Sequence, residues 1–107
     1  MNRDRVLQMI GLAMKAGKVK SGEFLTETEV KSGGACLVVL AGDASEATKK
    51  KFRNMCEFYQ VPFCIYGDKD TLGHAIGREF RASLAVTDDG FAKEIRKRLN
   101  QTEDTVA

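Results

Sequence analysis

The feature that most constrains this fold is an uninterrupted apolar run, Cys36-Leu37-Val38-Val39-Leu40-Ala41, with turn-forming residues on both sides. The run has the length of one strand, and it lacks the alternation of apolar and polar residues that is typical of a strand with one solvent-exposed face. It therefore predicts a central strand that is covered on both faces. A chain of 107 residues is long enough for one domain with its own core and too short for two.

Helical and strand-like segments alternate along the rest of the chain. Apolar residues three and four positions apart predict helices over 4–16, 22–32, 44–59 and 90–99, and a short helix over 70–76. Short strands are predicted at Val19, as an edge, and over 62–66 and 83–87. Alternation of this kind predicts an α/β fold with a largely parallel sheet between layers of helices.

Acidic and hydroxyl residues mark the predicted helix starts. Asp43 and Ser45 are both candidate N-caps of the third helix, while Asp70 and Asp88 are the predicted caps of the two later helices. After Leu99 no apolar stripe continues, so we expect residues 1–100 to form the single domain and 101–107 to be a polar C-terminal tail.

Catalytic and metal-binding chemistry finds little support in the sequence. His74 is the single histidine, with Asp70 four residues before it and no serine or cysteine close in sequence, so we interpret it as a surface side chain. An enzyme would need a pocket that holds this histidine beside an acid. Asp68 and Asp70, like Asp88 and Asp89, directly precede helices, where carboxylates stabilise the positive end. We therefore expect no enzyme activity, no metal and no cofactor.

Composition and charge limit the protein class further. The hydrophobic fraction of 43% and the net charge of +2 are ordinary for a globular protein. No apolar run approaches the length of a membrane helix, and the first residues lack the features of a signal peptide, so we expect a cytoplasmic protein with no membrane partner. The three cysteines match neither a redox pair nor a zinc pair in spacing, and we expect them to be small core residues.

Basic residues gather around two glycines in the segment Lys15-Ala16-Gly17-Lys18-Val19-Lys20-Ser21-Gly22-Glu23. Lysines attract phosphates, and the turn at the second glycine leads into a helix N-terminus, where backbone N–H groups bind anions. A solvated loop between two helices fits the same pattern equally well. A second basic run, at 49–53, is most simply the wet face of the third helix.

The loop before the last predicted strand reads Arg78-Glu79-Phe80-Arg81. Guanidinium groups next to an aromatic ring are typical of sites where an unpaired base stacks on a side chain. Phe80 fits equally well as a residue that covers the core. The sequence of this loop alone leaves both interpretations open.

Five segments in order resemble the ribosomal protein L7Ae/L30e superfamily: AGKVKSGE, CLVVLAGDAS, VPF, LGHAIG and SLAVTD. The resemblance spans about Leu7 to Phe91 and is strongest to the small bacterial members that are treated as ribosome-associated. It implies a three-layer α-β-α sandwich with a four-stranded mixed sheet, instead of the largely parallel sheet that alternation predicts.

Members of this superfamily bind RNA, typically a kink-turn with sheared G·A pairs, through two segments that correspond to 18–28 and 77–82 here. Together with the basic segment, the resemblance implies an RNA-binding set of Lys15, Lys18, Lys20, Ser21, Gly22, Glu23, Phe24, Arg78, Phe80 and Arg81. Kink-turn binders carry a polar pair where this sequence has Phe24-Leu25, and a lysine where it has Thr28.

Two functions are therefore predicted as alternatives. The first is a non-catalytic RNA-binding protein, monomeric and ribosome-associated, that binds structured, kink-turn-like RNA such as ribosomal RNA. The second is a protein-interaction module that docks on a ribosome-assembly or translation factor, which the modest net charge and the apolar Phe24-Leu25 pair favour.

Overall fold

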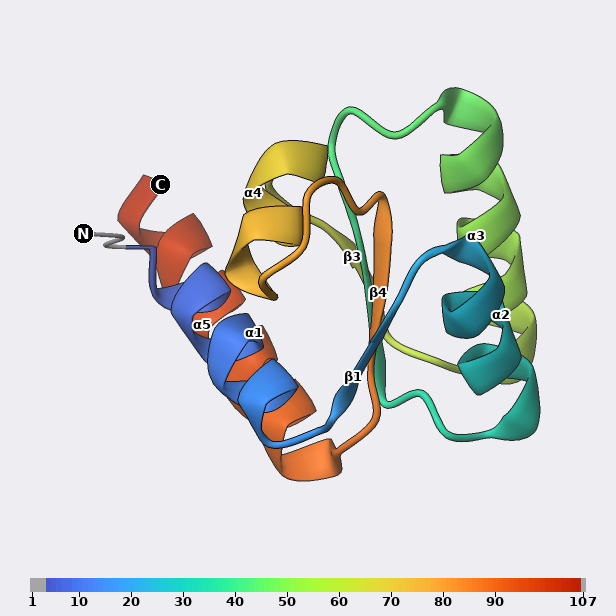
Figure 1. The fold of residues 1–107 in the computed structure, drawn as a ribbon, viewed down its shortest axis with the longest axis horizontal. Helices are drawn as coiled ribbons and strands as arrows, with labels where there is room; N and C mark the ends of the chain where they lie inside the picture. The colour runs from blue at the N-terminus through green and yellow to red at the C-terminus, as the bar shows by residue number, and fades with distance from the viewer. Residues whose placement is uncertain (1–3, 107) are drawn as a thin grey trace.

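The computed structural model describes residues 4–106, and the side chains of residues 4–101. Within this range, four strands form one sheet that lies between helices on both of its faces (Figure 1). The elements are α1 (Arg5–Lys15), β1 (Val19–Ser21), α2 (Glu23–Ser32), β2 (Leu37–Leu40), α3 (Glu46–Tyr59), β3 (Phe63–Ile65), α4 (Lys69–Ala75), β4 (Ser83–Val86) and α5 (Asp89–Val106). None of the helices described is both long and apolar enough to cross a membrane.

The sheet is mixed, with the strand order β1-β4-β2-β3. β2 and β3 are parallel, whereas β4 runs antiparallel to both of its neighbours, β1 and β2. The largely parallel sheet predicted from alternation is therefore wrong, and the mixed sheet implied by the resemblance is confirmed. The physical reason is the path of the 77–82 loop, which runs back along α4 so that the Arg81 N–H bonds the carbonyl of Lys69, the first residue of that helix; β4 therefore begins at the end of the sheet where β3 finishes.

Two cores lie on opposite faces of this sheet. Leu37 and Val39 of β2 face α1, α4 and α5, whereas Val38 and Leu40 face α2 and α3, where Phe52 is fully buried. All four residues of β2 are buried, as are all four of β4. This confirms the prediction that the apolar run at 36–41 is a central strand covered on both faces.

Side-chain caps set several helix starts, and one predicted cap is wrong. Of the two candidates for α3, Ser45 is the cap, because its Oγ accepts a first-turn N–H, while Asp43 instead accepts a backbone N–H at the start of α4. Asp68, and not Asp70, caps α4. The Asp68 carboxylate accepts the Thr71 N–H at 2.7 Å, and the Thr71 hydroxyl accepts the Asp68 N–H at 3.0 Å. This reciprocal capping box fixes the helix start two residues earlier than predicted.

The last helix is longer than predicted. Asp88 caps α5 as expected, since its carboxylate accepts the Phe91 N–H at 2.9 Å. The helix then continues to Val106, through most of the segment expected to be a polar tail. Residues 100–106 contain neither glycine nor proline to end the helix, so losing the apolar stripe did not mean losing the helix.

Candidate nucleic-acid interface

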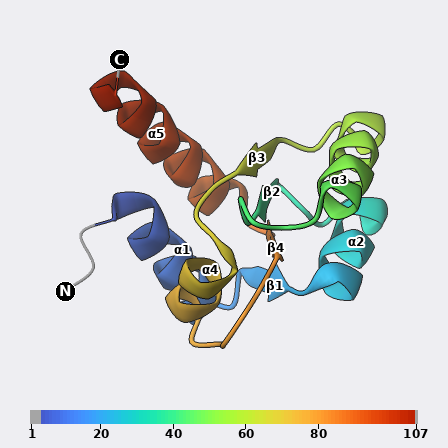
Figure 2. The same cartoon turned by 90° about the horizontal axis from the view of Figure 1, so that it is seen from above.

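The two segments implicated in RNA binding lie at one end of the sheet. Because β4 is antiparallel to β1 and β2, and β2 is parallel to β3, three strands finish at the end where β4 begins. The start of α2 and the 77–82 loop before β4 are both at this end, which Figure 2 shows from above. We call the surface formed by residues 20–25 and 77–82 the loop-end surface.

Gly22 sets the entry into α2. Its φ of 95° and ψ of 158° lie in a region that is essentially restricted to glycine, so a side chain here would strain the backbone. The Gly22 N–H donates to the carbonyl of Ser83 at 3.0 Å, which joins the turn to the start of β4. No side chain of the described residues caps this helix, so its first-turn N–H groups are available to an anion.

Arg81 joins the two segments through its side chain. Its Nε donates to the hydroxyl of Ser21 at 3.1 Å, and its Nη1 donates to the carbonyl of Phe80 at 2.7 Å. Ser21 and Arg81 are 60 positions apart in the sequence. The guanidinium group is thus held between the end of β1 and the 77–82 loop, and its donors that bond no described residue can meet a phosphate.

The 77–82 loop packs closely on α4. The Arg78 N–H donates to the carbonyl of Gly73 at 2.8 Å, and the Arg81 N–H donates to that of Lys69 at 3.1 Å. A Cβ at Gly73 would collide with the carbonyl of Glu79, so only glycine allows this approach. The loop is therefore positioned by backbone contacts, before any ligand is considered.

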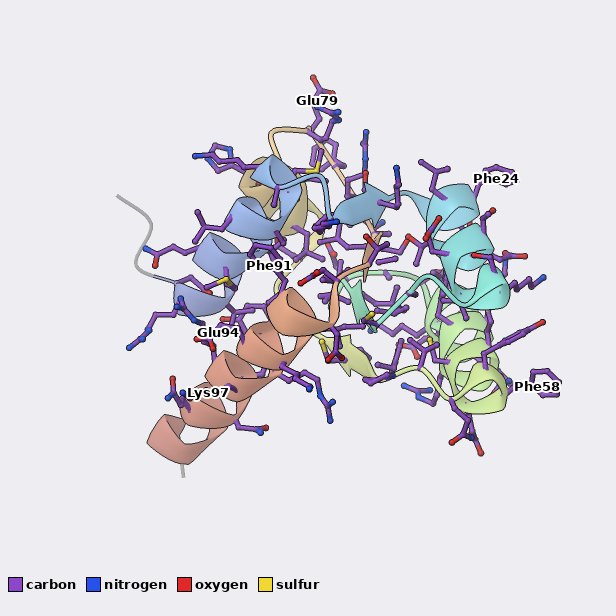
Figure 3. All side chains as sticks on the ribbon, turned by 90° about the horizontal axis from the view of Figure 1, so that it is seen from below. Phe24, Phe58, Glu79, Phe91, Glu94 and Lys97 are labelled. Atoms are coloured by element: carbon purple, nitrogen blue, oxygen red, sulfur yellow. The ribbon has the colours of Figure 1, made fainter. Side chains whose placement is uncertain are left out.

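Two aromatic rings project from the loop-end surface into solvent. Phe24, at the start of α2, is 79% exposed, and Phe80, in the 77–82 loop, is 62% exposed. Figure 3 shows the Phe24 ring pointing away from the body of the molecule. The interpretation of Phe80 as a core residue is therefore wrong, and both rings are accessible for stacking.

A lysine that sequence reasoning missed balances the acids of α2. Lys51 of α3 lies 3.2 Å from the carboxylate of Glu23 and 2.7 Å from that of Glu27, and Lys31 bonds the other oxygen of Glu27 at 2.8 Å. The hydrogen bond from Lys31, followed by that from Lys51, lowers the pKa of Glu27 to about 2. The bond to Glu27, and then that to Glu23, raises the pKa of Lys51. Lys51 thereby reduces the negative potential beside the helix start.

Family comparison now identifies the fold and its relatives. The family model described as "Ribosomal protein L7Ae/L30e/S12e/Gadd45 family" matches residues 4–96. The chain belongs to this family. It is 44% identical over 87 residues to the RNA-binding protein YlxQ of Bacillus subtilis (strain 168), with 81% of this chain and 87% of that protein covered. It is 38% identical over 96 residues to the RNA-binding protein YlxQ of Enterococcus faecium, with coverages of 90% and 92%.

Solved structures place the chain in the same L7Ae/L30e fold. A protein of unknown function from Bacillus halodurans C matches with a TM-score of 0.89 and 34% identity, covering 92% of this chain and 99% of that one. The Giardia lamblia 15.5kD RNA binding protein matches with a TM-score of 0.76, at 21% identity and coverages of 92% and 85%. The latter likeness shows the fold alone. The family resemblance predicted from the sequence motifs is confirmed.

The basic segment of this L7Ae/L30e-family chain is divided by β1. Lys20 is exposed on that strand and belongs to the loop-end surface. Lys18 lies at the opposite end of β1, where its carbonyl accepts the Thr87 N–H, and Lys15 is the last residue of α1. Three strand residues span about 10 Å. The structure thus brings together eight of the ten predicted residues and leaves Lys15 and Lys18 farther off.

Among the described residues, neither the histidine nor the two cysteines with the most strongly raised pKa values lie in an arrangement suited to catalysis. His74 is exposed and lines a shallow hollow with Leu7, Asp70 and Thr71, so an acid is near it, but that hollow has no nucleophilic serine or cysteine. Burial raises the pKa of the Cys56 thiol to about 11 and that of the Cys64 thiol to about 12, which keeps them protonated. Among the described residues no cluster of three or more potential metal ligands occurs.

Proposed function

We propose that this protein binds structured RNA of the kink-turn-like type, with ribosomal RNA as its target, through the loop-end surface. The names of the curated relatives, RNA-binding protein YlxQ, support RNA as the ligand. The family is named for ribosomal proteins, which supports both a non-catalytic role and association with the ribosome in the cytoplasm. We propose that the protein acts as a monomer.

The observation that carries this proposal is the hydrogen bond from Arg81 to Ser21. It holds the end of β1 beside the 77–82 loop, so that the uncapped start of α2 and a cationic loop face the same ligand. Lys20 and Arg78 are exposed, and neither has an ion-pair partner among the described residues. Backbone N–H groups and free cations together favour a phosphate chain.

Base recognition in this site rests on stacking more than on hydrogen bonds. Phe24 and Leu25 stand where kink-turn binders carry a polar pair, and the nearby Glu23 carboxylate is paired with Lys51. Phe24 and Phe80 offer two exposed ring faces on neighbouring segments. Unpaired bases of a bent RNA would stack on these rings, each such contact contributing about 1–3 kcal/mol.

The test is fluorescence anisotropy with a labelled kink-turn RNA and with a straight duplex in which Watson–Crick pairs replace the G·A pairs. The kink-turn should bind more tightly, and log Kd should rise with log salt by about 0.7–0.9 for each phosphate neutralised. Equal affinity for the two RNAs over the whole salt range would refute the preference for a kink-turn.

Matched variants locate the site. Phe24→Ala should weaken binding about tenfold, whereas Phe58→Ala should not, although Phe58 is 78% exposed, because it lies near the end of α3. Lys20→Glu should weaken binding and lower the salt slope, whereas Lys50→Glu, with the same charge change on α3, should act much less. Identical losses for each pair would remove the case for the loop-end surface.

A second candidate function is docking on a ribosome-assembly or translation factor. Phe24 and the 46%-exposed Leu25 form an adjacent apolar pair on α2, and such residues are common anchors of protein interfaces. Pull-downs before and after nuclease treatment separate the two functions. A contact that survives nuclease and is lost in Phe24→Ala is protein-mediated, and a contact that nuclease removes depends on RNA.

A further inference from the structure

A surface groove lies away from the loop-end surface, between β3 and α5. It has a volume of about 550 Å³, and its walls include Leu37, Pro62, Cys64, Tyr66, Arg96 and Leu99. In Figure 2 the ribbons of β3 and α5 border the same open side of the molecule, opposite β1. Because burial keeps the Cys64 thiol protonated, it contributes an uncharged wall to this groove.

The floor of this groove is an open sheet edge. β3 is the last strand in the order β1-β4-β2-β3, and the Pro62 carbonyl and the Tyr66 N–H bond to β2. Alternation along a parallel ladder therefore turns the N–H and C=O groups of Phe63 and Ile65 outward. The opposite edge, β1, carries Lys20, and lysine is a common protection against strand pairing, whereas residues 61–66 carry no charge.

The charge around the groove is positive. Arg96 lines both this groove and an adjoining hollow, whose other walls are Lys93, Lys97, Asn100 and Gln101. Lys93 is paired with Asp89, at 3.0 Å, whereas Arg96 has no ion-pair partner among the described residues. Aspartate and glutamate are absent from the described linings of both hollows.

This charge distinguishes between occupants of the edge. A second copy of the chain, paired edge to edge across a two-fold axis, would place the two Arg96 surfaces on the same small interface, where like charges repel. The phosphates of a nucleic acid would pair with the cations, but they would not satisfy the alternating N–H and C=O groups of the strand edge. An extended acidic peptide satisfies both features, because its backbone pairs with β3 and its carboxylates meet Arg96.

We propose that the groove between β3 and α5 binds an extended, acidic segment of a partner protein, which adds to β3 as a fifth strand. Side chains of an added strand alternate between the two faces of the sheet. Acidic residues on the α5 face pair with Arg96, and apolar residues on the α3 face cover Ile65, which is 40% exposed. The site is separate from the loop-end surface and does not depend on RNA binding.

The experiment uses the full chain and two fluorescein-labelled nine-residue probes, one in which Val alternates with Glu and one in which Lys replaces Glu. By anisotropy, the Glu probe should bind and the Lys probe should bind at least tenfold more weakly. Arg96→Glu should reduce affinity for the Glu probe about tenfold, whereas Lys50→Glu, with the same charge change on α3, should change it less than twofold. Amide hydrogen exchange of Phe63 and Ile65 should slow when the Glu probe is bound.

Four results would overturn the proposal. Equal binding of the two probes would remove the acidic preference, and unchanged exchange at Phe63 and Ile65 would exclude strand addition. If Arg96→Glu weakens binding of the kink-turn RNA and leaves the Glu probe unaffected, the basic hollow is an RNA contact instead. Concentration-dependent protection of the same two amides without any probe would identify a second copy as the occupant.

Discussion

Gly73→Ala tests whether the packing of the 77–82 loop on α4 is as tight as the structure indicates. Gly73 lies inside α4, where alanine is favoured over glycine by about 1 kcal/mol if nothing else changes. The added methyl group, however, would collide with the carbonyl of Glu79 and come within 3.1 Å of the Cα of Phe80. Helix propensity thus predicts that Gly73→Ala raises the free energy of unfolding, whereas packing predicts that it lowers it.

The packing cost is the larger of the two effects. Overpacking against backbone that must move costs typically about 1–3 kcal/mol. Displacing the loop also breaks the hydrogen bond from the Arg78 N–H to the Gly73 carbonyl, at a net cost of about 0.5–1.5 kcal/mol. After the gain in helix propensity is subtracted, Gly73→Ala should destabilise the protein by about 1–3 kcal/mol, which for a domain of this size lowers Tm by roughly 5–15 °C.

Thermal unfolding followed by circular dichroism measures this change, with Gly90→Ala as the control. Gly90 is also helical, but a methyl group there meets a side chain, the Asp88 carboxylate that caps α5, and no backbone; the gain in helix propensity offsets a weakened cap, so its Tm should fall much less than that of Gly73→Ala. If RNA binds the loop-end surface, Gly73→Ala should also weaken RNA binding, measured at a temperature well below Tm. A Gly73→Ala protein at least as stable as the unaltered one would refute the close approach of the loop to α4.

Further predictions concern two polar contacts outside the loop. The Tyr66 hydroxyl donates to Asp4 at 2.5 Å, so a double-mutant cycle of Tyr66→Phe and Asp4→Asn in urea should give a coupling of about 1–3 kcal/mol, and additive losses would contradict the bond. Burial, followed by this bond, raises the pKa of Tyr66 to about 12. Because the pKa is higher in the folded protein, the protonated hydroxyl stabilises the fold fully below pH 10, and this contribution is lost between pH 10 and about 12. Absorbance titration should show the raised pKa, and unfolding at several pH values should show the loss of stability. The pKa of Glu27 is lowered to about 2, so its ion pairs stabilise the folded protein fully above pH 4.5, and this contribution is lost as the pH falls below that value. The carboxyl pKa can be measured by an NMR titration, and a midpoint near 4.5 would contradict the ion pairs. Lys51→Ala leaves Glu23 uncompensated and should weaken RNA binding about twofold to fivefold in anisotropy at low salt, an effect that should vanish at high salt.

Strand order and direction were the part of the fold that local patterns could not determine. The apolar run at 36–41 correctly predicted a central strand, because burial on both faces leaves a direct mark on composition. Strand direction leaves no such mark. It depends on the loop after α4, which runs back to Lys69, and the pattern of Leu72 and Ile76 indicates only which face of α4 is buried. The family resemblance supplied the mixed sheet for this reason.

The candidate site was predictable in part. Gly22 and the 77–82 loop carry local signals, and the structure places both at one end of the sheet. The bond from Arg81 to Ser21 and the pairing of Lys51 with Glu23 join residues 60 and 28 positions apart, and no local pattern reports contacts at such separations. The clustering of lysines in the sequence was also misleading. Lys15 and Lys18 are close to Gly22 along the chain, but β1 separates them from it in the fold.

The order of the strands also governs how the two proposed sites relate. The loop-end surface is built on β1, the start of α2 and the loop before β4, whereas the groove is built on β3 and α5. β1 and β3 are the two opposite edges of one sheet, separated by the buried strands β4 and β2. A ligand at one edge therefore leaves the other edge uncovered, and the two proposed ligands, an RNA and an acidic peptide, would repel each other if they shared a surface. Placing them on opposite edges allows one small domain to hold a structured RNA and a partner protein at the same time.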